Sequence, residues 1–152
     1  LELSTLQRNV TDEDVDVGKC IDEALEYFKA DIKKKNITII KSLQEKTLKT
    51  KKEHLYILIS NIIKNAIKYN KEGWDIEIIL NKNRLEIKDT WQWIPRNEIN
   101  KIFERFYQVW EARNQEWYWI WLSLVKKLCD MYGRNISVKS EEWEWTTFYI
   151  TF

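Results

Sequence analysis

NIIKNAIKY, residues 61–69, ends a helix that we predict over about residues 53–69. At about 100° per residue, its polar side chains gather on one face and its apolar side chains fill the rest. The polar set is Ser60, Asn61, Lys64, Asn65 and Lys68, and the apolar set is Leu55, Leu58, Ile59, Ile62, Ile63 and Ala66. An asparagine oxygen suits Mg²⁺, and a lysine beside it suits a phosphate as a point charge. Taken alone, the face is explained more simply by solvent exposure, since asparagine and lysine are common at surfaces.

Helices and strands alternate on both sides of this helix. Apolar residues at helical spacing predict a first helix, and alternating residues predict the strands. The predicted helices cover residues 18–35, 53–69, a short segment opened by Pro95, and 120–132, with a polar and aromatic loop at 107–118. The predicted strands cover 37–43, a short stretch near Thr47, a hairpin of 76–80 and 85–87 with its turn at 81–83, then 136–139 and 147–152. This order favours an α+β fold, a two-layer α/β sandwich with helices packed on one face of a mixed sheet.

Composition fits one globular domain without a dedicated nucleic-acid or membrane surface. The chain has 152 residues and a net charge of +1, and its lysine runs at 33–35 and 49–52 are best explained as solvated faces. Cys20 and Cys129 lie far apart without CxxC spacing, so we expect buried thiols in a reducing compartment. No apolar run approaches the length of a membrane span, and the chain begins at Leu1 rather than Met. We therefore expect a fragment of a longer protein.

Four more motifs follow the helix in a fixed order. They are Asp89-Thr-Trp91-Gln-Trp93-Ile94-Pro, Phe103-Glu-Arg105-Phe106-Tyr107, Trp117-Tyr-Trp119-Ile-Trp121-Leu122-Ser-Leu and Trp143-Glu-Trp145-Thr146-Thr147-Phe148. With glycine written for the seven tryptophans in these motifs, the series resembles the N, G1, F, G2 and G3 boxes of the catalytic domain of bacterial sensor histidine kinases. The resemblance covers residues 12–152 and implies the Bergerat ATP-binding fold of the GHKL type. Residues 1–11 would then be a linker from a preceding dimerisation domain.

The resemblance implies a site for ATP and Mg²⁺. Asn65 would bind the metal, Lys68 and Tyr69 would lie near the phosphates, and Arg105 would approach the terminal phosphate as a catalytic residue. Asp89 would accept a hydrogen bond from the exocyclic amine of adenine, although by spacing alone it could equally start a turn. The full set of expected nucleotide contacts is Asn61, Asn65, Lys68, Tyr69, Asp89, Trp91, Trp93, Ile94, Phe106, Tyr107, Trp117, Trp119, Trp121, Leu122 and Thr146. Residues 107–118 would form a lid.

Asn61 separates phosphotransfer from hydrolysis. Related ATPases of the gyrase, mismatch-repair and heat-shock chaperone type carry a glutamate four residues before the metal-binding asparagine, where it activates water. An amide cannot act as a general base, so an ATP-hydrolysing relative is disfavoured. The resemblance therefore implies a cytoplasmic domain that phosphorylates a histidine on the dimerisation domain of the same kinase, with a response regulator receiver domain downstream. His54 lacks the surroundings of such an acceptor, and we expect a surface or first-turn histidine there.

The tryptophans that stand at glycine positions of the motifs lead to an alternative function. The chain holds 3 glycines and 9 tryptophans, and seven identical residues at seven motif positions favour one cause, engineering or an error in the written sequence, over natural divergence. Glycine serves in phosphate loops because it adopts positive φ and lets backbone N–H groups approach the ligand. Tryptophan in left-handed geometry would cost about 1–2 kcal/mol per position, and indoles at 117, 119 and 121 would compete with the phosphates. The alternative is a nucleotide-incompetent binding module of the same fold.

Overall fold

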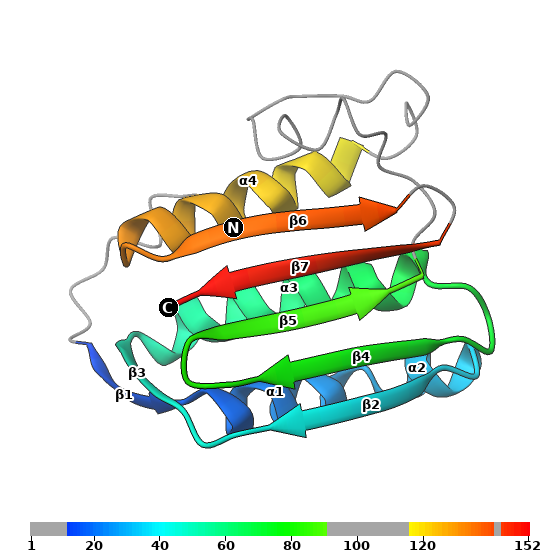
Figure 1. Cartoon of the computed structure of the whole chain (residues 1–152), viewed down its shortest axis with the longest axis horizontal. Helices are drawn as coiled ribbons and strands as arrows, with labels where there is room; N and C mark the ends of the chain where they lie inside the picture. Colours follow the sequence, from blue (N-terminus) through cyan, green and yellow to red (C-terminus); the bar gives the residue numbers. More distant parts are fainter. Residues whose placement is uncertain (1–11, 91–115, 142–143) are drawn as a thin grey trace.

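The computed structural model describes residues 12–90, 116–141 and 144–152, and the side chains of 116–120 are not described (Figure 1). Expectations for the linker at 1–11, the short helix at Pro95 and most of the loop at 107–118 lie outside these residues. Everything below refers to the described parts of the chain.

Five strands form the main sheet in the order β2-β4-β5-β7-β6. Their bounds are Thr38–Leu43 for β2, Asp75–Leu80 for β4, Arg84–Asp89 for β5, Asn135–Glu141 for β6 and Trp145–Thr151 for β7. β2 runs parallel to β4 and every other neighbouring pair is antiparallel, so the sheet is mixed as expected. A separate antiparallel pair is formed by β1 (Glu13–Asp16) and β3 (Thr47–Thr50).

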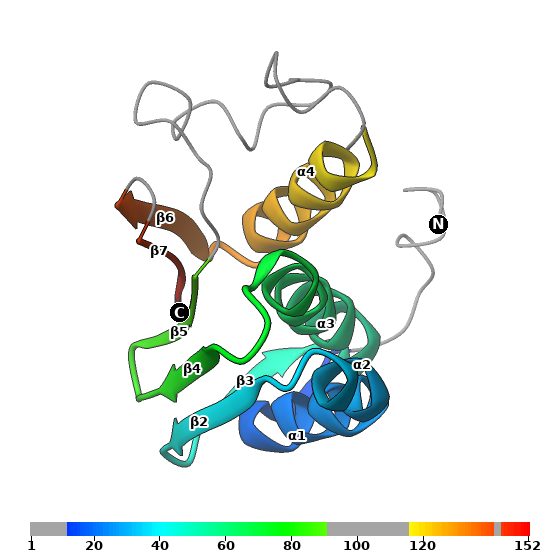
Figure 2. The ribbon, with the colours of Figure 1, turned by 90° about the vertical axis from the view of Figure 1, so that its right-hand side faces the viewer.

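The helices α1 (Val17–Tyr27), α2 (Lys29–Lys34), α3 (Lys52–Tyr69) and α4 (Glu116–Met131) lie on one side of the main sheet, as Figure 2 shows. Alternate side chains of the central strands face this helical layer and are buried, for example Ile76 and Ile78 in β4 and Leu85 and Ile87 in β5. α3 packs against both α1 and α4 and against β5, so it occupies the centre of the helical layer. The two-layer sandwich with helices on one face is therefore confirmed.

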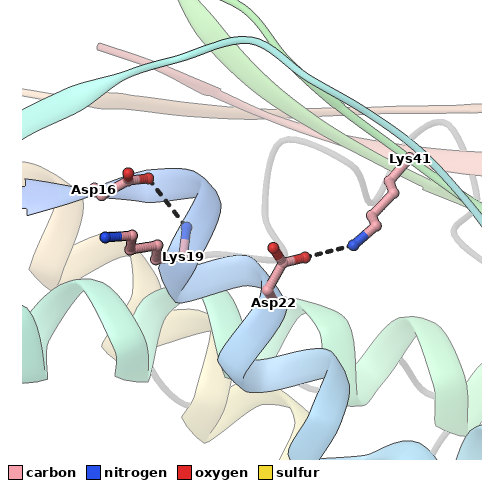
Figure 3. A network of polar contacts seen from close by, with 4 residues as sticks. All are labelled: Asp16, Lys19, Asp22 and Lys41. Carbon is pink, nitrogen blue, oxygen red and sulfur yellow. Dashed lines mark hydrogen bonds and ion pairs between the residues drawn. The ribbon is translucent and has the colours of Figure 1, made fainter.

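The predicted first helix, residues 18–35, divides into α1 and α2 at Phe28. Asp16 begins α1 by accepting a hydrogen bond from the backbone N–H of Lys19 at 3.1 Å, and Asp22 ties the helix to β2 through Lys41 at 2.6 Å (Figure 3). Phe28 is buried and leaves helical geometry (φ −91, ψ 9). The helical spacing of apolar residues continues across the break, which is why periodicity alone predicted a single helix.

α4 begins at Glu116, four residues before the predicted start at 120, and includes residues 116–118 of the predicted loop. Likewise β7 begins at Trp145 rather than at 147. Tryptophan is a better helix former than glycine by about 0.5 kcal/mol and is enriched in strands, so both elements extend into motif positions. Among described non-glycine residues only Asn36 has positive φ, at 52°. The expected left-handed strain is therefore wrong for the tryptophans at 117, 119, 121 and 145.

Candidate functional site

One end of the sandwich gathers the ends of the motif-bearing elements. At the right-hand side of Figure 1, β5 and α3 end where β7 and α4 begin. The two helices run in opposite directions there, so the C-terminal half of α3 lies beside the N-terminal half of α4. Segments that are far apart in sequence thus meet at one place, which is the candidate site.

A buried carboxylate lies at the end of β5. Asp89 is 2 % exposed and pairs in register with Thr146 of β7, which is 0 % exposed. Both continue the buried alternation of their strands, so they lie on the side of the sheet that faces the helices. The Thr146 hydroxyl lies 3.0 Å from the Ser140 hydroxyl, which donates to the Trp145 carbonyl at 3.2 Å. The structure thus places the Asp89 carboxylate beside Thr146 on the buried side of the sheet.

The polar face of α3 is less uniform than the periodicity predicted. Lys64 and Lys68 are exposed and Asn65 is half-buried, as a ligand-facing surface requires. Asn61 is buried instead, and its amide donates to the Ile57 carbonyl one turn earlier at 2.7 Å. Its donor is therefore engaged by the helix, and a neutral amide in this place has no capacity to take a proton from water.

Trp121 brings an indole onto this face of α3. The ring is half-buried, and the ammonium of Lys64 lies 5.3 Å from its centroid, within cation–π range. The contact places aromatic bulk on the helical face that carries Asn65 and Lys68. Leu122, the next residue, is 1 % exposed and belongs to the hydrophobic core rather than to an open site.

Trp145 points the other way. It alternates with Thr146 along β7 and its ring meets the ammonium of Lys88 at 5.2 Å. Both side chains line a shallow pocket of about 210 Å³, whose walls are Glu77, Ile79, Glu86, Lys88, Trp145, Thr147 and Tyr149. These residues come from the face of the sheet opposite the helices, so the indole of Trp145 lies away from Asp89.

Asn70 is a site neighbour that motif reading missed. It is 4 % exposed and follows the last residue of α3. Its side-chain oxygen accepts from the backbone N–H of Thr90 at 3.0 Å and from the Thr90 hydroxyl. Thr90 is the residue after Asp89. An asparagine directly after a helix is a signal for local side-chain to backbone bonding, but its partner 20 residues away is invisible in the sequence.

Lys35 anchors the same helix end. Its ammonium donates to the carbonyls of Ile67, Lys68 and Asn70 at 2.9, 2.6 and 2.9 Å. These carbonyls are among the unpaired groups at the negative end of α3, where a cation is stabilising. Burial lowers the pKa of Lys35 from its usual value, which the nearby Glu72 partly offsets.

Several expected residues lie outside the described parts of the chain. They are Trp91, Trp93, Ile94, Arg105, Phe106, Tyr107 and Trp143, together with the side chains of Trp117 and Trp119. Within the described residues no group of three or more His, Cys, Asp or Glu side chains is placed to hold a metal ion.

The histidine and the two cysteines of the chain are buried, and they lie away from the candidate site. His54 stands in the first turn of α3, as expected, but it is not at the surface, and its Nδ1 lies 2.7 Å from the Tyr132 hydroxyl. Cys20 and Cys129 are both buried free thiols, as predicted. Burial raises the pKa of Cys20 to about 11 and that of Cys129 to about 12.

Comparison with known proteins identifies one family and several sensor kinases that resemble this chain. The family described as "Histidine kinase-, DNA gyrase B-, and HSP90-like ATPase" matches residues 50–152. The sensor protein kinase WalK of Staphylococcus aureus is 32% identical over 90 residues, covering 54% of this chain and 22% of that kinase. The chain thus spans less than a quarter of the length of this curated relative.

Solved structures with the same fold include three histidine kinases. The mycobacterial sensor histidine kinase MprB matches with a TM-score of 0.79 and 21% identity, over 92% of this chain and 97% of its own. Full-length ShkA in complex with AMPPNP matches with a TM-score of 0.80 and 19% identity, over 94% of this chain and 31% of its own. The nucleotide-free catalytic domain of ThkA matches with a TM-score of 0.78 and 18% identity, over 94% of this chain and 95% of its own. At these identities the likeness establishes the fold alone. No helix in the described part of the chain is long and apolar enough to cross a bilayer.

Proposed function

The chain belongs to the histidine kinase-, DNA gyrase B- and HSP90-like ATPase family, and from this premise we propose that it is the ATP-binding catalytic domain of a sensor histidine kinase. Residues 12–152 would form the domain and residues 1–11 the linker to a dimerisation domain. The domain would transfer the γ-phosphoryl group of ATP to a histidine on that dimerisation domain, in the cytoplasm, and a response regulator receiver domain would accept it next. The observation that carries the proposal is the buried carboxylate of Asp89 beside Thr146, facing the α3 helix that holds Asn61 and Asn65.

Asp89 would select the base. A buried carboxylate accepts hydrogen bonds only, so it favours the exocyclic amine of adenine over the oxygen that guanine carries at the same ring position. Thr146 lies beside it in register and has a hydroxyl that can both donate and accept. Because the pair is taken out of water by the sheet and the helices, mismatched partners would be costly.

Asn65 and Lys68 would hold the phosphate end. They lie on successive turns of α3 with accessible surface, and a half-buried amide oxygen beside exposed ammonium groups fits a metal that is held mainly by phosphate oxygens. Asn65 would hold a Mg²⁺ ion through its amide oxygen, and the ion would supply positive charge that offsets the charge of the phosphates. Lys68 would add a point charge, and Arg105 would approach the transferring phosphoryl group.

Asn61 supports a kinase rather than a hydrolase. Its amide donates to the Ile57 carbonyl and cannot act as a base toward water. His54 does not supply an acceptor either, because it is buried and lies against Tyr132. The nucleophile would therefore be an imidazole from another domain.

A second candidate function rests on Trp121. Its indole lies over Lys64 on the face of α3 that would meet the phosphates. A chain with such bulk on the phosphate-facing side of α3 would keep the fold and its docking surfaces while excluding nucleotide. This nucleotide-incompetent binding module is the alternative to the kinase.

Phosphotransfer to a supplied acceptor tests the proposal. The domain with glycine at residues 91, 93, 117, 119 and 121 is mixed with labelled ATP, Mg²⁺ and a dimerisation domain that carries an acceptor histidine. We expect label on the acceptor, retained in His54→Gln, and very slow ATP hydrolysis when the acceptor is absent. Fast hydrolysis without acceptor would favour an ATPase, and the absence of both binding and transfer would favour the binding module.

A further inference from the structure

The side chain of Asn70 joins three segments that are separate in the sequence. Its amide nitrogen donates to the carbonyls of Trp74 and Asp75 at the start of β4, at 3.3 Å each. Its oxygen accepts from the backbone N–H and the hydroxyl of Thr90 at the end of β5. The Thr90 hydroxyl in turn accepts from the backbone N–H of Lys71 at 3.2 Å. A single amide thus connects the end of α3, the start of β4 and the end of β5.

The connected segments are those that carry the two halves of the proposed nucleotide site. Thr90 directly follows Asp89, the proposed adenine contact, and Asn70 directly follows Tyr69 at the end of the α3 motif. The amide therefore spans from the base side of the site to the phosphate side. Since Asn70 is almost completely buried, deleting its side chain would remove the side-chain acceptor of the Thr90 N–H and a donor to the Trp74 and Asp75 carbonyls, of which the Trp74 carbonyl keeps the Thr38 N–H at 3.4 Å.

Lys35 stiffens the α3 side of this connection. Its ammonium donates to two carbonyls of the last α3 turn and to that of Asn70, and the Lys35 carbonyl accepts from the Gly73 N–H at 2.9 Å. The end of α3 is therefore held by the chain between α2 and β2.

We propose that Asn70, through Thr90, is a positioning residue that sets the separation between Asp89 and the phosphate-facing side of α3. The inference rests on the proposed function, because it assigns a role within that nucleotide site. A misplacement of about 1 Å between groups that grip one ligand can cost up to about 100-fold in function. Loss of the link should therefore lower the affinity for ATP and blur the preference for ATP over GTP, while the fold persists.

A matched asparagine serves as control. Asn81 accepts from the backbone N–H groups of Asn83 and Arg84 at 2.9 Å, in the turn at the other end of the β4–β5 hairpin. Asn70→Ala and Asn81→Ala each remove an asparagine that orders backbone at one end of the same hairpin. We expect Asn70→Ala to weaken ATP binding about tenfold and to reduce the ATP preference, and Asn81→Ala to preserve both when each is assayed well below its melting temperature.

A milder pair keeps the test valid where Asn70→Ala fails to fold. Thr90→Val removes the hydroxyl and keeps the N–H bond to Asn70, whereas Thr90→Ser keeps both. We expect weakened, less selective binding in Thr90→Val and wild-type behaviour in Thr90→Ser. Amide hydrogen exchange without nucleotide gives a second readout, in which the Thr90 and Lys71 amides should exchange faster in Asn70→Ala than in Asn81→Ala.

The outcomes separate this role from the proposed function. Binding is measured in the parent chain and in one with glycine at residues 91, 93, 117, 119 and 121. If neither binds ATP, the proposed function is wrong and the role of Asn70 falls with it. If either binds, equal affinity and equal ATP preference in Asn70→Ala and Asn81→Ala, or in Thr90→Val and Thr90→Ser, overturn the inference alone.

Discussion

Replacing the tryptophans at 91, 93, 117, 119 and 121 by glycine should lower the stability of the free chain and restore binding of ATP. Residues 117, 119 and 121 are helical, and the Trp121 ring lies under the ammonium of Lys64 at 5.3 Å. Glycine would remove this ring from the polar face of α3 and free the backbone N–H groups at the start of α4 to meet phosphates. The glycine variant should therefore be less stable than the parent chain without ligand, and it should bind ATP.

The size of the stability loss follows from α4. Glycine is less favourable than tryptophan in a helix by about 0.5 kcal/mol, so three helical positions cost about 1–1.5 kcal/mol. Loss of the Lys64 contact adds about 0.5–1 kcal/mol. A total of about 2 kcal/mol lowers the melting temperature by about 4–8 °C in a domain of this length. ATP with Mg²⁺ at about 100 times its dissociation constant should return about 2.7 kcal/mol, which cancels the shift.

Differential scanning fluorimetry with and without ATP and Mg²⁺ measures both effects, after intact mass has established every tryptophan in the parent chain. Trp74→Ala is the control, because this 51 % exposed indole also meets a lysine, Lys71, at 4.8 Å but belongs to none of the glycine-type motifs. It should leave the response to nucleotide unchanged. Tight ATP binding by a parent of confirmed mass, or no response in the glycine variant, would refute the steric reasoning.

Three further predictions concern single positions. In the chain that binds ATP, Asn65→Ala should remove most of the Mg²⁺-dependent part of the affinity by deleting a coordinating oxygen, and equal Mg²⁺ dependence in calorimetric titrations would exclude that role. Asp89→Asn should weaken ATP more than GTP, because the new amide presents a donor to the adenine amine; unchanged discrimination would remove Asp89 from the base pocket. Burial raises the pKa of Cys20 to about 11 and of Cys129 to about 12, so both thiols stay protonated below those values and iodoacetamide at pH 8 should label them slowly in the native chain and quickly in urea. Rapid labelling of either cysteine without denaturant would contradict their burial.

Local patterns in the sequence were sufficient for most elements. The apolar spacing in α3 and the alternation in β4 and β5 predicted those elements to within a few residues, because one face of each must be buried and the period of the pattern reveals which. The order of the motifs predicted the family, because each motif is a short contiguous stretch that can be recognised without the structure. Predictions were wrong where a local preference changed an element's extent. The break at Phe28 and the early start of α4 depend on packing and on tryptophan in place of glycine.

Contacts between distant residues were decided by the tertiary structure alone. Register between β5 and β7 puts Asp89 beside Thr146, and Asn70 meets Thr90 across 20 residues. His54 was expected at the surface or in a first turn, and it lies in the first turn of α3 but is buried, because its Nδ1 lies 2.7 Å from the hydroxyl of Tyr132, 78 residues away. A periodic pattern reports which side of an element is apolar, but it carries no information on which element will cover that side. Burial of a polar group and the identity of its partner are properties of the assembled layers, so they become known only when the layers are packed.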